Sequence, residues 1–512
     1  GGPGGLYFSL LMKLNDSRHD ITVYERNKPG DTFGFGVVFS DETLGNFMGQ
    51  DPETYLKIRD AFAYWDEIEV RYRGERIRSG GHGFAGMSRQ KLLDILQERC
   101  NDVGVHMKFE TEINDLEPYR DADLVLGSDG ANSMVRDAYK EMFKPTIDMR
   151  KTKFVWLGTT QKFDAFTFIF KPNEHGWFYN HAYQYGQGKG LAASTWILET
   201  HEDTWIRAGL DQSNEAETIA YFEDMFREEL EGHKLLSNKS IWRNFPVVSN
   251  QNWYHENVVL IGDAAHVTPP FVGQGLVAGL RDAANLSWKI ASVLQGNSHS
   301  QILDSYDVER RPHAKAMIKL AVLAGKVVMP QNKLAAFVSH GIVRVMSFIP
   351  VLKNQLQELE IKPKNAFKKG LFIPGKNRIK RGHPIMQTPL RNSTGEVKNS
   401  DDIAKGEFRL LGFGFHPEKH LSTTMIERWQ EFGGASLQVC HRNQVLNRPN
   451  RDCCWEDVQG DLLPNSVPMG WVVIVRPDQV VMHEGPMEDV EKILEQVFEK
   501  VGFSQEQQLA VS

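Results

Sequence analysis

Three glycine-containing segments combine residue types that could bind a dinucleotide. The first opens the chain: Gly2 and Gly5 have the spacing of the last two glycines of G-x-G-x-x-G, and Glu25 follows 20 residues after Gly5. Glycines let a backbone approach a pyrophosphate, and the N-terminus of a following helix offers N–H groups to it. An acid about 20 residues later is where such folds bind a ribose. Alone, this segment is equally well explained as a flexible glycine-rich start.

Two later segments repeat the pattern of a short apolar strand followed by an acid and glycines. The apolar run 124–126 leads into Asp129-Gly130, and the run 258–261 leads into Gly262-Asp263. Pro270, Gly273 and Gly275 follow the second of these. Each segment alone favours an ordinary turn at a strand end, where Asp and Gly are common. Three such segments in this order over about 275 residues indicate a shared role in binding a nucleotide.

Helices and strands must hold these segments in place. Leucines at helical spacing after Gly5 predict a helix, and Ile21–Glu25 reads as a short β-branched strand. Arg89–Arg99 reads as a helix, and apolar residues four apart after Gly275 predict a long one. A strand before the first glycines would lie upstream of residue 1. The pattern predicts an α/β fold with a Rossmann-like nucleotide-binding domain.

In these motifs the sequence resembles the group A FAD-dependent aromatic monooxygenases, which share the fold of p-hydroxybenzoate hydroxylase. The resemblance implies that Glu25 holds the adenosine ribose, that Asp263 holds the ribityl chain, and that 273–275 face the flavin pyrimidine edge. Arg89 matches an arginine that meets the FAD phosphates and ribityl; without the resemblance it would be a solvated residue at a helix start. The expected cofactor-binding residues are Gly2, Gly5, Glu25, Arg26, Arg89, Asp129, Gly130, Gly262, Asp263, Pro270, Gly273 and Gly275.

Two parts of the chain resemble different members of this group. Residues 1–266 look like salicyloyl-CoA and 2-aminobenzoyl-CoA hydroxylases, through stretches such as Ser79–Phe84 and Phe154–Gly158. The later part looks like 3-(3-hydroxyphenyl)propionate and phenol hydroxylases, through Val267–Gly275 and Gly279–Leu286. The chain would then be a natural hybrid, a fragment or a recombined sequence. The FAD site is common to both groups, whereas the substrate pocket is not.

The same reasoning predicts five segments. Residues 1–150 form the first part of the FAD-binding domain, and 151–245 form an inserted substrate-binding β-sheet. The FAD-binding domain returns at 246–350 with helices. Residues 351–406, rich in Lys and Arg, are expected to be a solvated connector, or else a rim that binds the phosphates of a CoA ester. Residues 407–512 resemble a thioredoxin-like domain, which lacks C-x-x-C and therefore has a structural role in packing or in a homo-oligomer.

The resemblance also implies a reaction. NADH or NADPH reduces FAD, and O₂ then forms a flavin hydroperoxide that hydroxylates a small phenolic or aminoaromatic substrate, possibly a CoA thioester. A base for the phenolic proton is expected among His175, Tyr179, His181 and Tyr183, although each is individually more typical of strand packing. An FAD-dependent reductase or oxidase and an inactive flavin-binding hybrid are the alternatives. The halogenase pattern W-x-W-x-I-P is absent.

The composition argues against several other classes of protein. With 59 Lys and Arg against 66 Asp and Glu, the net charge is −7, which argues against a nucleic-acid binder. The 4 cysteines form no C-x-x-C or Cys/His pattern, so no metal site is predicted. No stretch of about 18 uncharged apolar residues is present, so no membrane span is predicted. These features suit a cytoplasmic protein.

Overall fold

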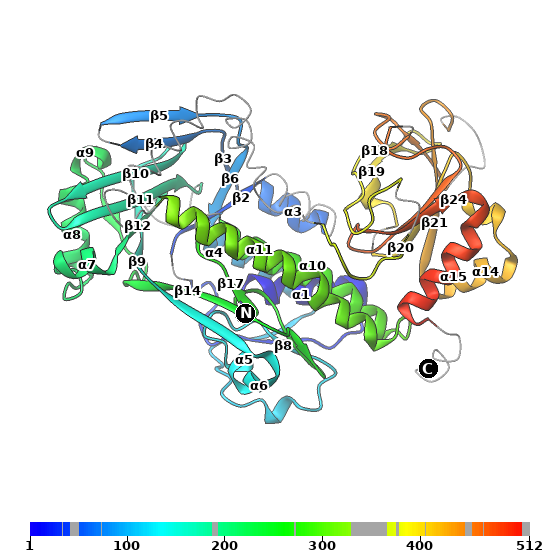
Figure 1. Ribbon diagram of the computed structural model, residues 1–512, viewed down its shortest axis with the longest axis horizontal. Coiled ribbons are helices and arrows are strands. Elements are labelled where there is room, and N and C mark those ends of the chain that lie inside the picture. Colours follow the sequence, from blue (N-terminus) through cyan, green and yellow to red (C-terminus); the bar gives the residue numbers. More distant parts are fainter. Residues whose placement is uncertain are drawn as a thin grey trace. The chain divides into compact units, whose positions relative to one another are not determined.

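The computed structural model describes most of the 512 residues. The described residues are 1–32, 34–40, 51–72, 74–186, 193–270, 273–328, 366–374, 378–404, 406–445, 453–463 and 465–503. They cluster into two compact units (Figure 1). The first unit comprises Gly1–Leu10, Asp20–Arg281 and Ala314–Pro363, and the second comprises Leu11–His19, Asp282–His313 and Lys364–Ser512. The finer division into five segments stays a prediction.

The predicted elements around the three motifs are present. Parallel pairing joins β1 to β7 and β8 to β16, and β15 pairs antiparallel with β16. The strands are β1 (Thr22–Tyr24), β7 (His106–Lys108), β8 (Val125–Gly127), β15 (Tyr254–His255) and β16 (Val258–Leu260). The helices are α1 (Pro3–Asn15), α4 (Arg89–Asp102), α5 (Met134–Ala138), α6 (Lys140–Phe143), α10 (Gly275–Leu294) and α11 (Asp304–Val328). Ser88 caps α4 by accepting a hydrogen bond from the N–H of Lys91.

A large, mostly antiparallel sheet forms the other part of the first unit (Figure 1). Its strands lie in the order β17-β14-β9-β12-β11-β10-β4-β5, and β13 pairs with β9. Their bounds are β17 (His266–Val267), β14 (Arg243–Asn250), β9 (Pro145–Thr159), β12 (Ser194–His201), β11 (Gly176–Gln184), β10 (Phe166–Asn173), β4 (Ile68–Tyr72), β5 (Glu75–Ser79) and β13 (Leu235–Leu236). Two of these strands, β4 and β5, come from far upstream of the predicted sheet segment.

The two faces of this sheet have different environments because side chains alternate along each strand. One face packs Leu157, Phe178 and Trp196 against Phe222 in a single apolar cluster. The helices on this face are α7 (Glu202–Arg207), α8 (Glu215–Met225) and α9 (Arg227–Leu230) (Figure 1). The opposite face therefore carries the alternate residues of β9, β10, β11 and β12.

A small sheet and a short helix complete the described part of the first unit. The sheet has the order β2-β6-β3, and all its pairings are antiparallel. The elements are β2 (Gly36–Ser40), α3 (Pro52–Arg59), β3 (Ala63–Trp65) and β6 (Phe84–Ser88). Since β6 leads directly into α4, this sheet fixes where Arg89 begins its helix.

The second unit contains the predicted thioredoxin-like fold. A β-α-β half with parallel strands is followed by a β-β-α half, in the sheet order β19-β18-β22-β21-β20-β23-β24. The elements are β18 (Pro389–Arg391), β19 (Val397–Asn399), β20 (Phe408–Phe413), α14 (Thr423–Glu431), β21 (Gly434–Cys440), β22 (Cys454–Asp457), β23 (Trp471–Val475), β24 (Val481–Pro486) and α15 (Val490–Val501). The closing helix α15 buries the apolar face that its spacing predicted.

The expected solvated connector is wrong where the structure describes it. Phe367, Leu371 and Ile373 are buried, and Leu371 and Ile373 belong to the core of the second unit. Apolar burial thus outweighs the basic composition that suggested a solvated segment. Residues 353–365 and 375–377 of the basic stretch, and the helices expected between 329 and 350, lie outside the described residues.

Membrane insertion through a helix finds no support in the described ranges. None of the helices there is both long and apolar enough to cross a bilayer.

Candidate functional site

Four of the predicted glycines leave their backbone accessible. A Cβ atom built on Gly2, Gly130, Gly273 or Gly275 would meet no heavy atom within 4 Å. Gly130 and Gly273 also have φ angles of +84° and +61°, which glycine adopts without the strain of other residues. All four positions therefore have room for a ligand to approach the main chain closely.

Other glycines allow the segments themselves to pack closely. A Cβ on Gly5 would lie 2.3 Å from Oγ of Ser128, directly after β8, and one on Gly4 would lie 3.8 Å from the carbonyl oxygen of Gly279 in α10. A Cβ on Gly279 would in turn lie 3.3 Å from Cα of Gly262. These close approaches bring the three motifs together in space, although they are far apart in the sequence.

The acid after β1 is fixed beside the start of the chain. Oε1 of Glu25 accepts hydrogen bonds from the backbone N–H and the side-chain amide of Asn27, at 2.8 and 2.6 Å. Its Oε2 lies 3.5 Å from the terminal nitrogen of Gly1. Arg26 differs from the other expected residues: it is exposed and lies 3.8 Å from Glu112 on the surface.

The remaining predicted residues lie at turns that precede helices. Oδ2 of Asp129 accepts a hydrogen bond from the N–H of Val135 at 3.1 Å, in the first turn of α5. Asp263 lies in the 3₁₀ turn η2 (Gly262–Ala264) after β16. The carbonyl of Pro270 accepts a 2.8 Å hydrogen bond from the N–H of Gly273, just before α10 begins. Residues 271 and 272 lie outside the described residues.

Arg89 joins this nucleotide-binding region to the large sheet. Its guanidinium carbon lies 5.4 Å from the ring centroid of Trp156 in β9, within the range of a cation–π contact. Burial lowers the pKa of Arg89, and electrostatic attraction to Asp263 and Tyr183 acts in the opposite direction. A motif acid and two aromatic residues of the sheet therefore surround one guanidinium.

The loop before β2 lies on the same face of the sheet. The hydroxyl of Tyr183 donates a 3.0 Å hydrogen bond to the carbonyl of Gly36. A Cβ on Gly34 would lie 2.9 Å from the Trp156 ring, and one on Gly158 would lie 2.7 Å from the Phe35 ring. This face is therefore a close-packed aromatic surface next to Arg89.

Two parts of the chain match known protein families. Residues 86–321 match the family described as FAD binding domain, which spans Arg89, both acid–glycine motifs and α10. Residues 86–321 are an FAD-binding domain. The prediction that FAD is the cofactor is therefore confirmed. Residues 382–500 match a second family, described as HcaD C-terminal domain.

Two hydroxylases are similar in sequence to parts of this chain. The chain is 41% identical over 319 residues to the salicyloyl-CoA 5-hydroxylase of a Streptomyces species, a match that covers 61% of this chain and 60% of that protein. It is 34% identical over 234 residues to the 3-(3-hydroxy-phenyl)propionate/3-hydroxycinnamic acid hydroxylase of Burkholderia cenocepacia (strain HI2424), covering 44% and 42%. The chain thus spans less than two thirds of either relative. Both predicted resemblances are confirmed.

Solved structures confirm the fold around the FAD-binding domain. The flavin-dependent monooxygenase PieE, crystallised with FAD and substrate, aligns with a TM-score of 0.67 at 15% identity and covers 98% of each chain. At this identity the likeness concerns the fold alone. It agrees with the predicted combination of a Rossmann-like FAD-binding domain, an inserted sheet and a C-terminal domain.

The four residues expected to include the base do not lie together. Tyr179, His181 and Tyr183 alternate along β11 and so share the face that carries Trp156. His175 instead lies in the turn between β10 and β11, where its Nε2 is 3.4 Å from Glu174, so its expected place within the sheet is wrong. Burial raises the pKa of Tyr179 and of Tyr183 and lowers that of His181 to about 4.

Sequence reasoning missed Glu199, which pairs with Tyr179 across β12 and β11. Its side chain is 1% exposed, and its Oε1 lies 3.9 Å from Nδ1 of His181. Burial raises the pKa of Glu199 to about 8. An acid directly after the apolar residues Trp196, Ile197 and Leu198 is a signal in the sequence, but the strand pattern does not say which residues lie opposite it.

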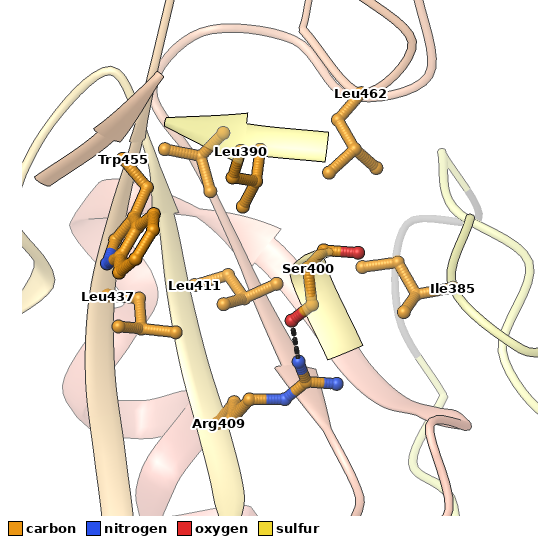
Figure 2. Close-up of a pocket in the computed structure, with 9 residues that line it drawn as sticks. Ile385, Leu390, Ser400, Arg409, Leu411, Leu437, Trp455 and Leu462 are labelled. Atoms are coloured by element: carbon orange, nitrogen blue, oxygen red, sulfur yellow. Dashed lines mark hydrogen bonds between the residues drawn. The ribbon is translucent and has the colours of Figure 1, made fainter. Parts of the chain in front are cut away.

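A small cavity in the second unit has a different character. Figure 2 shows it between β-strands, with Leu390, Leu411 and Trp455 in its lining. These residues belong to an apolar core cluster. Arg409, at its edge, donates a 2.5 Å hydrogen bond to the carbonyl of Ser400 and a second one to Gln479. The cavity is therefore a gap in a core whose polar group is already satisfied.

Proposed function

We propose that the protein is an FAD-dependent aromatic hydroxylase that uses NADH or NADPH and O₂ as co-substrates. One observation carries this proposal: Arg89 lies among Asp263 of the nucleotide-binding region and Trp156 and Tyr183 of the sheet. A cofactor seated on the three motifs would have its reactive end beside an aromatic surface. This is the arrangement required to bring a flavin to an aromatic ring.

The residues of the FAD-binding domain suit the parts of FAD. The accessible backbone at Gly2, Gly130, Gly273 and Gly275 allows close approach by the pyrophosphate and flavin, and α1 and α10 present their N-termini there. We assign the adenosine ribose to Glu25 and the ribityl chain to Asp263. Gly5 and Gly262 act indirectly, by letting the segments pack. Bound FAD supplies the redox chemistry that activates O₂.

Arg26 is less suited than Arg89 to contact FAD directly. It is exposed and already lies beside Glu112. Arg26 is tied to Glu112 at 3.8 Å, whereas Arg89 is enclosed by the two halves of the site. Arg89 therefore positions the cofactor against the sheet in this proposal. Pro270 shapes the turn that presents Gly273.

The sheet face holds the substrate. Trp156 and the aromatic residues of β10 and β11 provide flat apolar surface for a ring, and the Tyr183–Gly36 hydrogen bond fixes the loop that covers it. An aromatic enclosure also keeps water from the reacting centre, which an oxygen-transfer reaction requires. Polar groups on this face, among them Tyr179, His181 and Glu199, are positioned to orient the ring.

The substrate class follows the more extensive relative. The 41% identity over 319 residues supports a hydroxybenzoyl or aminobenzoyl thioester such as salicyloyl-CoA, rather than 3-(3-hydroxyphenyl)propionate. A protein with these co-substrates would work in the cytoplasm.

A combined spectroscopic and kinetic experiment tests the proposal. The purified chain should have a flavin absorption spectrum, and salicyloyl-CoA should stimulate NADH or NADPH oxidation more than 3-(3-hydroxyphenyl)propionate does. With ¹⁸O₂, one labelled oxygen should enter the product, which separates a hydroxylase from a reductase or an oxidase. The Arg89→Gln variant should bind FAD about tenfold more weakly, equal to a loss of about 1.4 kcal/mol. An Arg120→Gln surface variant is the control. A colourless protein that takes up no added FAD would overturn the proposal.

A further inference from the structure

We propose that Glu199 accepts the proton of the ring hydroxyl of the substrate. This inference rests on the proposed function. It names a base, which the sequence left open among four other residues.

The first support is a buried carboxyl that lacks a partner. Oε1 of Glu199 is buried and accepts no hydrogen bond from any residue that the structure describes, and the same holds for the hydroxyl of Tyr179 beside it. A buried polar group left without a partner costs about 1–3 kcal/mol. Two such groups side by side on the face next to Trp156 leave hydrogen-bonding positions that a ligand can complete.

The second support is the chemistry of the surroundings. The neighbours on this face are Tyr179 and His181 of β11, Phe168 and Phe170 of β10, Phe154 of β9, and Ile197 and His201 of β12. No Lys or Arg within the described ranges forms an ion pair with Glu199. Burial keeps His181 neutral near pH 7, because its pKa is lowered to about 4.

These surroundings make Glu199 a suitable base. Its pKa, raised by burial to about 8, lies between those of an ordinary carboxyl and an ordinary phenol. A general base is most effective when its pKa is close to the working pH. The neutral imidazole of His181, 3.9 Å away, adds a polar neighbour without neutralising the carboxylate.

The third support is the spacing along the sheet. Trp156 pairs with Ile197, and Phe154 pairs with Glu199, so Glu199 lies two residues further along the same face. Two residues of a strand correspond to roughly 6–7 Å. Arg89 and Asp263 lie at the Trp156 end, where the flavin is placed in the proposed function.

A ring bound along this direction can place its hydroxyl about 2.7 Å from Glu199 and extend towards the Arg89 end of the face.

The proton step is balanced within the site. The O–H bond of the substrate breaks, and a new O–H bond forms on the Glu199 carboxylate, which becomes a carboxylic acid. The electron pair of the broken bond stays on the substrate oxygen and is delocalised onto the ortho and para ring carbons. These carbons thereby become better nucleophiles towards the electrophilic oxygen derived from O₂.

The experiment compares Glu199→Gln with a control, Glu202→Gln, which removes an acid three residues away that pairs with Lys153 at 3.2 Å. At equal FAD content, hydroxylation of salicyloyl-CoA by Glu199→Gln should fall about 100-fold, as expected for the loss of a general base. The control should keep the wild-type rate. Glu199→Asp, which retains a displaced carboxylate, should recover part of the rate.

A second readout does not depend on turnover. The absorption of bound 4-nitrophenol reports its ionisation, and its apparent pKa in Glu199→Gln should be higher than in the wild type by about one unit or more, corresponding to a tenfold change in equilibrium. A wild-type rate in Glu199→Gln or an unchanged nitrophenol titration would each overturn the proposal. If the wild type hydroxylates nothing yet shifts nitrophenol ionisation through Glu199, the proposed function fails and the proton-accepting role stands.

Discussion

Glu199 in the large sheet and Glu309 in the second unit are both almost fully buried, but their partners differ completely. Oε1 of Glu309 lies 2.6 Å from Nη1 of Arg476, and its Oε2 lies 2.9 Å from Nζ of Lys289. Asp478 pairs with Arg476 as well, so the charges of two acids and two bases in this cluster balance. For Glu199, the ion-pairing group recorded within the described residues is the neutral imidazole of His181, 3.9 Å from its Oε1.

The comparison shows that partners, and not burial alone, decide what a buried acid can do. Burial acting alone would raise the pKa of Glu309, but Arg476 and Lys289 together bring it below the usual range. Glu199, without such cations, has its pKa raised to about 8. Glu309 therefore stays ionised and holds its unit together, whereas Glu199 can change its protonation state near neutral pH.

The largest expected effect comes from breaking the balanced cluster. Glu309→Gln would leave Arg476 and Lys289 without their shared carboxylate and should destabilise the protein by about 3–5 kcal/mol. Chemical denaturation followed by tryptophan fluorescence measures this, since Trp288 lies 5.2 Å from the Arg476 guanidinium. A loss below about 1 kcal/mol would mean that the cluster contributes no more than a surface pair.

The stability of the native state should depend on the ionisation of Glu199 in the opposite sense to that of a paired acid. An ordinary Glu has a pKa of 4.5, whereas folded Glu199 has one of about 8. Between these values the unfolded chain releases a proton that the folded protein keeps, so the native state loses stability as the pH rises. Glu199→Gln removes this loss, and its stability relative to the wild type should rise by about 3 kcal/mol from about pH 5 to pH 8.

Denaturation midpoints of both proteins at the two pH values test this prediction. Glu309→Gln measured in parallel should lack the upward trend. A stability difference between Glu199→Gln and the wild type that does not change with pH would show that Glu199 is paired after all.

A smaller effect is expected from Lys289, the weaker partner of Glu309. Burial lowers the pKa of Lys289 to about 8, and Arg476 still holds the carboxylate when Lys289 is replaced. Lys289→Met should therefore cost about 1–2 kcal/mol, mainly from the acceptor left on Asn285. A cost equal to that of Glu309→Gln would show instead that Lys289 and Arg476 contribute as an inseparable unit.

The smallest effect is expected from an exposed pair. Lys398 lies 3.0 Å from Glu396, and both side chains are about half exposed. Solvent screening should limit the cost of Lys398→Gln to less than about 0.5 kcal/mol. The same denaturation measurement gives the cost of breaking an exposed pair. If Lys398→Gln costs more than Lys289→Met, burial does not explain the ranking of these effects.

The sequence predicted those features that depend on neighbouring residues. Arg89 at a helix start, the strand before Asp129-Gly130 and Gly275 at the start of α10 all follow from local patterns, and the structure has each of these elements. The thioredoxin-like half was predictable for the same reason, because the closing helix has a clear apolar face.

The features that were missed depend on contacts between distant residues. Glu199 gains its character from the register Tyr179↔Glu199, and a shift of one residue would place it on the opposite face. The cluster around Glu309 joins residues up to 193 positions apart, such as Asn285 and Asp478. No local pattern contains that information, and the basic composition near 366–374 concealed a buried segment for the same reason.

The alternation along β11 and β12 also bears on how such a protein can evolve. Phe178, Ala182, Trp196 and Leu198 belong to the helix-covered core, whereas Tyr179, His181 and Glu199 lie between them on the other face. Mutations on the second set leave the packed layer untouched. Under the proposed function, a lineage could therefore exchange one aromatic substrate for another while inheriting the same scaffold, and a library restricted to those alternate codons would search new specificities with few unfolded clones.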